Sequence, residues 1–455
     1  MTIESINPHK PSDTVARFEA AGPGGVKSSV ARAGDAFAEW SAQTAIVRGT
    51  ALRQIAEDIE GRAEEFTELM VREVGKPLAE TQQEIGRAVS IFRYHAQMAL
   101  APNGMTYPAS DAVSWLMERR FPVGVCGLLT PWNFPIAIPA WKLAPALACG
   151  NTAVLKPAPQ ATATAQLLHE IANKHLPGGV FELVTGDAET GEPLVDHPGV
   201  AAVSFTGSVP VGHEIAKRVA GRGAKLQCEM GGQNPSVVLA DADLDKAATA
   251  IAFATMGYAG QKCTATSRVI IESPVYGTFK DKLVAAVEDM GVEDPSSESC
   301  KVGPLIEEEA RQNALEAIQD SGGNVVTGGS PLDSEGFYLA PTLVEVDDRS
   351  SVLAKEEVFA PVVALLQVGS PDEGIALAND VRFGLVAAVF TSDLGRAMEF
   401  SGKLEAGLVR VNAPTSGVDF HAPFGGSKES SIGPREQGLA AREFFTETRT
   451  LLISP

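Results

Sequence analysis

The spacing of apolar and polar positions divides the chain into regions. Residues 29–100 are rich in alanine, and their apolar side chains recur at helical spacing with charges between them, as in ALRQIAEDIE. Gly75, Lys76 and Pro77 interrupt this run, which predicts a helix end followed by a new helix. We therefore expect the first hundred residues to be mainly helical.

From about residue 121 the pattern changes to short β-branched runs that alternate with helical segments. The expected strands of this region are VGVCGLL, TAVLKP, FELVTG, AAVSFTG and SVVLA, and the expected helices are 138–149, 160–175, 208–220 and 243–256. The alternation resumes after residue 263 with RVIIE, NVVTGG, PVVALLQV, LVAAVF and GLVRVN as strands and 274–289, 305–320 and 372–380 as helices. Such alternation predicts two doubly wound parallel α/β domains, joined near Gly231 and Gly232 and meeting at a cleft.

The tail, roughly residues 436–455, ends in the β-prone run FFTETRTLLISP. No hairpin partner lies nearby in the sequence. This terminal strand must therefore pair with a distant segment or with another chain.

Composition and charge exclude several classes of function. The chain has 455 residues, of which 44 % are hydrophobic and 21 % charged, enough for several domains with sizeable cores. Its net charge of −20 repels phosphate backbones and anionic lipid, so nucleic-acid and membrane partners are disfavoured. The most apolar stretch, residues 134–149, contains Lys142 and three prolines, which argues against a membrane span.

The five cysteines indicate reduced thiols. They are widely spaced, and no pair has the spacing of a zinc site, so we expect neither a disulfide framework nor a metal site. The N-terminus MTIESINPHK lacks the features of a signal peptide. These observations predict a cytoplasmic protein.

Three polar residues have local settings that suit catalysis. Cys263 lies among small residues in GYAGQKCTA, where backbone N–H groups could stabilise an oxyanion, although an isolated cysteine is more often buried and inert. Glu229 ends a strand before two glycines, where partial burial would raise its pKa toward that of a general base; a solvated glutamate is the alternative. Asn133, framed by prolines in TPWNFP, could donate to a substrate oxygen or simply form a turn.

Two strand ends could bind a cofactor. SFTGSVPVG joins a strand to a helix, with Gly207 allowing a phosphate to approach and Ser208 capping the helix, but it is not a G-x-G-x-x-G motif and a plain turn would look similar. Lys156 ends the strand TAVL and could bind ribose hydroxyls or a 2′-phosphate. A surface lysine is the alternative.

Taken together, these segments resemble the aldehyde dehydrogenase superfamily over essentially the whole chain. The matching motifs, in the order and spacing of the family, are LLTPWNFP, GNTAVLKP, SFTGS, EMGG, GQKCTA, EEVFAP and HAPFGGSK. The resemblance implies that Cys263 is the nucleophile, Glu229 the base that activates water, and Asn133 part of the oxyanion hole. Lys142 and Glu436 match positions linked to proton relay.

The resemblance also implies a nicotinamide cofactor and names its contacts. The implied cofactor-binding residues are Thr130, Pro131, Trp132, Lys156, Gly207, Ser208, Glu357 and Phe359. Pro159 stands where many NAD-preferring members carry a glutamate that would repel a 2′-phosphate, and Lys156 and Gln160 lie nearby. We therefore expect NADP to be accepted, and favoured over NAD, without NAD being excluded.

The architecture that the resemblance implies has three parts. Residues 1–102 and 121–231 would form a dinucleotide-binding domain, residues 232–435 a catalytic domain, and residues 103–120 and 436–455 a small β oligomerisation arm. This arm would give the terminal strand a partner in a second subunit. We accordingly expect a homodimer or a homotetramer.

The substrate is expected to be an aldehyde that carries a carboxylate. GYAGQKCTATSR and GVDFHAPFGGSKESSIGPREQG are similar to members of the superfamily that act on 2-oxoglutarate semialdehyde. Phe424 and Lys262 are the implied substrate contacts, with Lys262 a possible donor to the distal carboxylate. Alternatives are succinate semialdehyde, an aliphatic, aromatic or phosphorylated aldehyde, a CoA-acylating enzyme, which Glu229 argues against, or a catalytically silent binding or structural protein.

Overall fold

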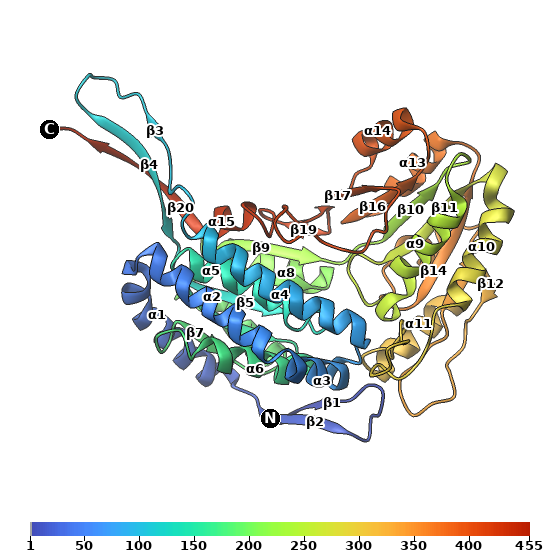
Figure 1. The fold of residues 1–455 in the computed structure, drawn as a ribbon, viewed down its shortest axis with the longest axis horizontal. Coiled ribbons are helices and arrows are strands. Elements are labelled where there is room, and N and C mark those ends of the chain that lie inside the picture. The colour runs from blue at the N-terminus through green and yellow to red at the C-terminus, as the bar shows by residue number, and fades with distance from the viewer. Residues whose placement is uncertain (1) are drawn as a thin grey trace.

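A computed structural model describes residues 2–455, in which a six-stranded sheet organises the first body (Figure 1). Its strand order is β19-β9-β8-β5-β6-β7, and only β19 is antiparallel to its neighbour. The strands are β5 (Val125–Thr130), β6 (Thr152–Pro157), β7 (Phe181–Leu183), β8 (Val200–Gly207), β9 (Lys225–Met230) and β19 (Ser431–Ile432). β6 coincides with the expected strand TAVLKP.

Helices cover both faces of this sheet. The helices of the first body are α1 (Gly22–Ala42), α2 (Ala45–Gly61), α3 (Ala63–Val74), α4 (Leu78–Met98), α5 (Ala137–Ala148), η1 (Pro159–Ala161), α6 (Thr162–Ala172), α7 (Ala188–Asp196) and α8 (Val209–Ala220). Successive residues of β6 point to opposite faces: Ala153 and Leu155 pack with the helices α2, α4, α5 and α6, whereas Val154 packs with α1, α7 and α8. The expected doubly wound arrangement is confirmed.

A seven-stranded sheet organises the second body. Its order is β12-β13-β14-β11-β10-β16-β17, with only β12 antiparallel. The strands are β10 (Asn234–Val238), β11 (Thr266–Glu272), β12 (Asn324–Thr327), β13 (Thr342–Glu345), β14 (Val362–Val368), β16 (Val386–Phe390) and β17 (Leu408–Val411). The helices are α9 (Leu244–Met256), η2 (Gly257–Gly260), η3 (Ser273–Val275), α10 (Tyr276–Glu288), α11 (Glu308–Asp320), α12 (Val352–Lys355), α13 (Pro371–Asn379) and α14 (Leu394–Lys403).

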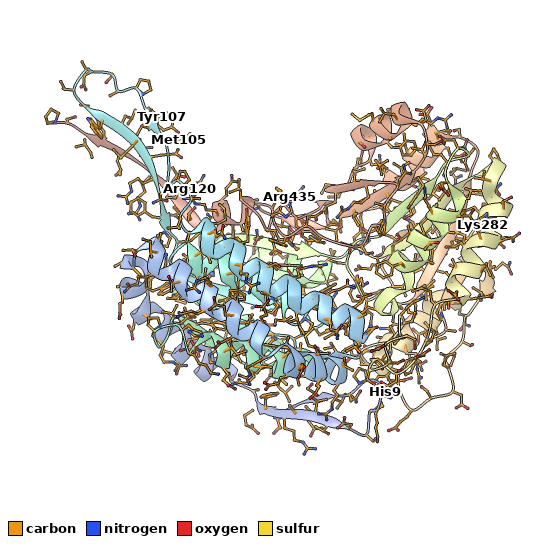
Figure 2. All side chains as sticks on the ribbon, in the orientation of Figure 1. His9, Met105, Tyr107, Arg120, Lys282 and Arg435 are labelled. Carbon is orange, nitrogen blue, oxygen red and sulfur yellow. The ribbon has the colours of Figure 1, made fainter. Side chains whose placement is uncertain are left out.

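A three-stranded arm projects from the first body, as Figure 2 shows at Met105 and Tyr107. It has the order β20-β4-β3, and its elements are β3 (Thr106–Tyr107), β4 (Trp115–Pro122) and β20 (Thr446–Ile453), preceded by α15 (Ala440–Phe444). β20 pairs with β4 of the same chain, from Thr446 opposite Pro122 to Ile453 opposite Trp115. The terminal strand therefore pairs with a distant segment of its own chain, one of the two predicted alternatives, and β20 keeps one open edge.

Short or atypical strands escaped the sequence analysis. β1 (Thr2–Ile6) and β2 (Thr14–Glu19) form an N-terminal hairpin, and β15 (Phe383–Gly384) pairs with β18 (Ser427–Lys428). In β1 the inward positions are Ile3 and Ser5, so a buried serine hides the alternation. No helix within residues 2–455 combines the length and apolar character that crossing a membrane requires.

The end of α3 carries a buried carboxylate that joins three elements. Gly75 adopts the left-handed conformation (φ 62°), which ends α3 where the sequence predicts. Before this turn, Glu73 accepts hydrogen bonds from the Ser5 hydroxyl of β1 and from the backbone N–H groups of Ala163 and Thr164 at the start of α6. Burial raises the pKa of Glu73. The carboxylate thereby holds α3, α6 and the N-terminal hairpin together.

We predict that Glu73→Ala destabilises the protein by about 3–5 kcal/mol, because it leaves several buried donors without an acceptor. Glu68→Ala, on an exposed position of α3, is the matched control and should change stability by less than about 0.5 kcal/mol. Urea denaturation followed by circular dichroism measures both. Equal losses in the two variants would contradict the role given to Glu73.

Candidate active site

Cys263 lies between the two bodies, on a strained turn that follows α9. Tyr258 and Ala259 of η2 have positive φ angles of 57° and 53°, which turn the chain sharply before β11. Asn234 of β10 holds the turn by donating from Nδ2 to the Cys263 carbonyl at 2.8 Å. The partly exposed Cys263 lines a cavity of about 80 Å³, together with the predicted substrate contacts Lys262 and Phe424.

Burial and, to a smaller extent, nearby carboxylates determine the ionisation of this thiol. Burial raises the pKa of Cys263 to about 12, and the charges of Glu357, Glu229 and Glu436 raise it further. The group is therefore a thiol at neutral pH. It can attack a carbonyl only if a nearby base accepts its proton, since the thiolate is the nucleophilic form.

Glu229 is a buried carboxylate near the carboxyl end of β9 in the first sheet. Its Oε2 accepts a hydrogen bond from the Ser431 hydroxyl at 2.6 Å, and β19 places Ser431 directly opposite Glu229. Within residues 2–455, its Oε1 has no hydrogen-bond partner. Burial and the neighbouring Glu436 raise the pKa of Glu229 well above the ordinary range, in the direction that the sequence predicts. An unpartnered carboxylate oxygen of this kind is free to accept a proton.

Lys142 and Glu436 form a buried ion pair beside Glu229. Lys142 comes from α5 and Glu436 from the segment before α15, and the lysine also donates to the Ser204 hydroxyl of β8 at 2.8 Å. The Glu436 backbone exchanges two hydrogen bonds of 2.8 Å with Phe424, which lines the Cys263 cavity. The pair therefore connects the thiol cavity with the interior of the first body.

Asn133 is held rigidly by residues that sequence reasoning missed. Its side-chain Nδ2 donates to the Gln261 carbonyl at 2.9 Å and keeps a second N–H, while its own carbonyl accepts from Lys76 Nζ at 2.8 Å. The fully buried Lys76 pairs with Glu84, whose Oε1 caps α5 by accepting from the N–H groups of residues 136 and 137 at 3.0 Å. The sequence marks Gly75–Pro77 only as a helix boundary, so nothing there signals a buried lysine.

A second cavity, of about 570 Å³, opens at the carboxyl ends of the first sheet's strands. Five of the predicted cofactor-binding residues line it: Thr130, Pro131, Lys156, Gly207 and Ser208. The hydroxyls of Thr130 and Thr206 are buried there without a partner among residues 2–455. Ligands of open α/β sheets bind at such strand ends, and the start of α8 offers unpaired backbone N–H groups. These polar groups fit a dinucleotide.

Two details of this cavity differ from expectation. Ser208 occupies the N-cap position of α8, but its side chain makes no capping hydrogen bond, so the predicted cap is wrong. Lys156 is buried and donates to the carbonyls of Pro157 at 2.8 Å and Gly186 at 2.6 Å. Burial lowers its pKa to about 8, so it is not a surface lysine.

The remaining predicted cofactor contacts lie at the junction of the two bodies. Trp132 packs edge-on against Phe359 with ring centres 5.8 Å apart. Glu357 Oε1 accepts from the Gly232 N–H at 3.1 Å, and burial raises its pKa to about 7. A side chain at Gly231 would collide with Glu357, which accounts for a glycine there.

One face of α4 lines the thiol cavity and carries a cation that the sequence analysis missed. Glu80, Gln83, Glu84 and Arg87 follow one another at helical spacing along this face. Lys262, the predicted donor to a substrate carboxylate, is already paired with Glu80 at 2.7 Å. Arg87 makes no ion pair or hydrogen bond with any side chain of residues 2–455, so it is the free cation of the cavity. Only the fold brings it beside Cys263.

Comparisons with known proteins show which family the chain belongs to. The family model described as "Aldehyde dehydrogenase family" matches residues 1–451. The chain is 41 % identical to an alpha-ketoglutaric semialdehyde dehydrogenase of Bacillus subtilis, over 100 % of this chain and 95 % of that protein. It is 38 % identical to a 2,5-dioxopentanoate dehydrogenase of Saccharolobus solfataricus, over 98 % and 95 %.

The fold is also similar to that of a solved structure. The NAD-dependent aldehyde dehydrogenase of Sinorhizobium meliloti superposes with a TM-score of 0.97 at 32 % identity, covering 100 % of this chain and 92 % of that one. The chain belongs to the aldehyde dehydrogenase family.

Proposed function

We propose that this chain oxidises a small aldehyde with a distal carboxylate, foremost 2-oxoglutarate semialdehyde, to the acid through an acyl intermediate on Cys263. The names of the similar proteins from Bacillus subtilis and Saccharolobus solfataricus support this substrate. The observation that carries it is Arg87, an unpaired cation in the cavity of the thiol. A guanidinium binds a carboxylate through two parallel hydrogen bonds.

The first half of the reaction forms a bond between Cys263 and the aldehyde. A neighbouring carboxylate takes the thiol proton as sulfur attacks the carbonyl carbon. Both Glu357 and Glu229 act on the thiol, so Glu357 can still take this proton when Glu229 is replaced. The tetrahedral oxyanion accepts hydrogen bonds from the free N–H of the Asn133 amide and from the Cys263 backbone. Lys76 and Glu84 hold Asn133 in place.

The second half releases the acid. Once the substrate carbon is oxidised, a thioester joins the acyl group to Cys263. Glu229 removes a proton from a water molecule, which attacks the thioester and frees the carboxylic acid and the thiol. The Lys142–Glu436 pair provides the route by which the proton leaves the buried base. Glu229 thus argues for hydrolysis rather than for transfer of the acyl group to CoA.

The 570 Å³ cavity would hold the cofactor. Thr130, Pro131, Lys156, Gly207 and Ser208 line it. Trp132, Glu357 and Phe359 lie at the junction of the two bodies, where the charge of Glu357 acts on Cys263. A nicotinamide bound there supplies the acceptor for the electron pair that the substrate loses. NADP is accepted as well as NAD because Pro159 presents no carboxylate. Three acidic residues also line the cavity, but each already has a partner in the protein. Glu192 and Glu214 pair with Arg218, and Asp187 caps α7.

The arm supports assembly into a homodimer or a dimer of dimers. β20 is an edge strand, and Met105, Trp115, Leu452 and Ile453 on the arm are each more than half exposed (61 %, 69 %, 62 % and 57 %). An open edge with exposed apolar side chains is suited to pairing with a second copy. The five free cysteines support a reducing, cytoplasmic location.

Replacing the base should separate the two half-reactions. We predict that Glu229→Gln gives a burst of about one NAD(P)H per chain and then turns over about 100-fold or more slowly, because acylation survives and hydrolysis fails. In the parent enzyme, hydrolysis should quicken as pH rises through the raised pKa of Glu229. Stopped-flow absorbance measures both phases.

Cysteine variants provide the controls for this experiment. Cys263→Ala should abolish both the burst and turnover, whereas Cys300→Ala, in a buried site outside the cavity, should retain both. Steady turnover of Glu229→Gln at the parental rate would remove Glu229 from the role of base.

Removing the free cation should affect only charged substrates. We predict that Arg87→Met lowers kcat/KM for 2-oxoglutarate semialdehyde by about 10- to 100-fold, the factor expected for the loss of a charge-assisted hydrogen bond. The kcat/KM for pentanal, which has no carboxylate, should be nearly unchanged. Arg93→Met, on α4 but paired with Glu60, is the matched control. An equal loss with both aldehydes would show that Arg87 is structural.

Cofactor choice can be tested at residue 159. We expect kcat/KM with NADP to lie within about 100-fold of the value with NAD, a difference of about 2.7 kcal/mol. Pro159→Glu should reduce activity with NADP selectively, since a carboxylate repels the 2′-phosphate, and Pro159→Gln serves as the uncharged control. A parent enzyme that discriminates more strongly against NADP would contradict this assignment.

A further inference from the structure

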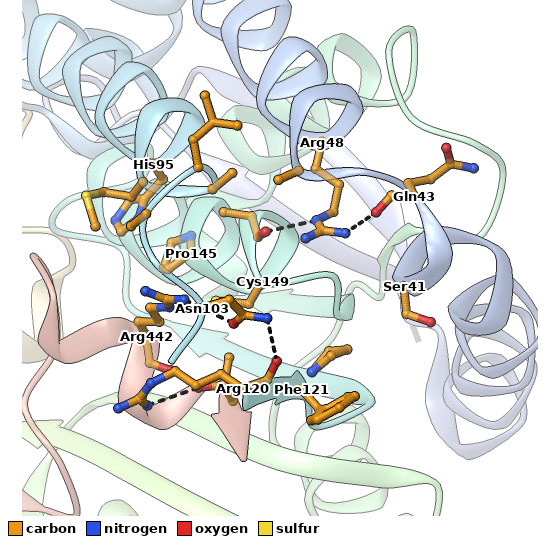
Figure 3. Close-up of a pocket in the computed structure, with 18 of the residues that line it drawn as sticks. Ser41, Gln43, Arg48, His95, Asn103, Arg120, Phe121, Pro145, Cys149 and Arg442 are labelled. Atoms are coloured by element: carbon orange, nitrogen blue, oxygen red, sulfur yellow. Dashed lines mark hydrogen bonds between the residues drawn. The ribbon is translucent and has the colours of Figure 1, made fainter. Parts of the chain in front are cut away.

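A cavity of about 480 Å³ lies at the base of the arm, away from the proposed reaction (Figure 3). The start of α2, the end of α4, the end of α5, β4 and α15 enclose it. Among the described residues, none that lines it also lines the cofactor cavity or the thiol cavity. Its volume is within the range of small-molecule sites.

Four arginines line this cavity, which we call the arginine cavity: Arg48 of α2, Arg119 and Arg120 of β4, and Arg442 of α15. Of its lining residues within 2–455, none is an aspartate or a glutamate. Nor does any of the four arginines lie within 4.0 Å of a carboxylate in the described chain. A patch without acids is unexpected in a chain with 57 acidic and 37 basic residues, where Arg218 alone pairs with three acids.

Neutral oxygens hold the arginines and leave most of their donors free. Arg48 donates from Nε to the Ala148 carbonyl at 2.9 Å, and Arg442 donates to Asn103 Oδ1 at 3.1 Å. Arg120 makes one long hydrogen bond of 3.4 Å to the Thr446 hydroxyl. A guanidinium has five N–H donors, so several remain on each side chain.

The arginines converge on one point of the cavity. Figure 3 shows Arg48, Arg120 and Arg442 around Cys149, at the end of α5. The charges of these three arginines act on the Cys149 thiol and oppose the rise in its pKa caused by burial. Burial lowers the pKa of both Arg48 and Arg442, and the charge of Arg120 lowers that of Arg442 further. The cationic forms of Arg120 and Arg442 therefore repel each other, and the charges of Arg48 and Arg442 are only partly solvated.

His95 adds an independent polar group to the same cavity. This α4 residue is only 4 % exposed, and its ring nitrogens make no hydrogen bond with residues 2–455. The ring nitrogens are not among the polar atoms of the described chain that are sealed from solvent without a partner, so they can be reached from the cavity. Its position in the wall makes it available to a ligand.

We propose that the arginine cavity binds a small anion with two or more carboxylate or phosphate groups. Planar guanidinium forks match both kinds of group, and such an anion would relieve the mutual repulsion of the arginines. Because the arginines come from α2, β4 and α15, the bound anion joins the arm to the helical layer of the first body. The proposal is independent of the substrate and of the catalytic roles assigned above.

Calorimetric titration of the full-length protein tests this site, with citrate and pyrophosphate as the probes. We expect saturable binding of at least one probe, and which of them binds distinguishes a carboxylate from a phosphate ligand. Arg120→Gln and Arg442→Gln should each weaken binding by about 10-fold or more. Arg349→Gln, which removes a charge paired with Glu373 in the second body, should leave the affinity unchanged.

Two controls separate a loss of binding from a loss of folding or of charge. Circular dichroism checks that each variant is folded, and Arg442→Lys, which keeps the charge but loses the fork, should bind less tightly than the parent. Absence of saturable binding to the parent protein at matched ionic strength would overturn the proposal, as would equal affinities in all variants. If the arginine variants instead dissociate an oligomer in anion-free buffer, the cavity receives an acidic segment of a second copy, and the proposal is wrong.

Discussion

The arrangement depends on burying carboxylates around a thiol with little opposite charge to compensate them. Glu229, Glu357 and Glu436 all act on Cys263, and Lys142 pairs with Glu436 alone. Burying charges of one sign together is costly, so Glu229, Glu357 and the Cys263 thiol hold their protons more tightly than they would in water. Strongly shifted pKa values are typical of functional sites, and these fit the proposed transfer of protons between sulfur, carboxylate and water.

The site exists only where the two bodies and the tail meet. Cys263 comes from the second body and Glu229 from the first. Strand β19, about two hundred residues later in the sequence, pairs with β9, and its Ser431 donates a hydrogen bond to Glu229. Further along, Phe424 and Glu436 are tied by backbone hydrogen bonds, which connect the thiol cavity to the ion pair beneath it. Movement of the tail would therefore disturb Glu229 and the cavity wall together.

Periodic patterns made most of the fold predictable, and chemistry at strand ends made much of the site predictable. The run TAVLKP coincides with β6, and Gly75 ends α3 as expected, because buried strands and left-handed glycines leave local signals. Contacts across the chain leave none: β20 pairs with β4 over more than three hundred residues, and Arg87 reaches the thiol cavity only because α4 packs there. The burial of Lys76 could not be predicted either, because the residues next to a buried lysine in the sequence do not distinguish it from a lysine on the surface.

The rate at which iodoacetamide alkylates Cys263, followed by peptide mass spectrometry as a function of pH, tests the electrostatic coupling most directly. If the thiol lies among buried carboxylates, its reactivity rises only at high pH, and Glu229→Gln shifts the profile to lower pH by removing one negative neighbour. A profile that is typical of a free cysteine, near pH 8.5, and is unchanged by the substitution would contradict the account.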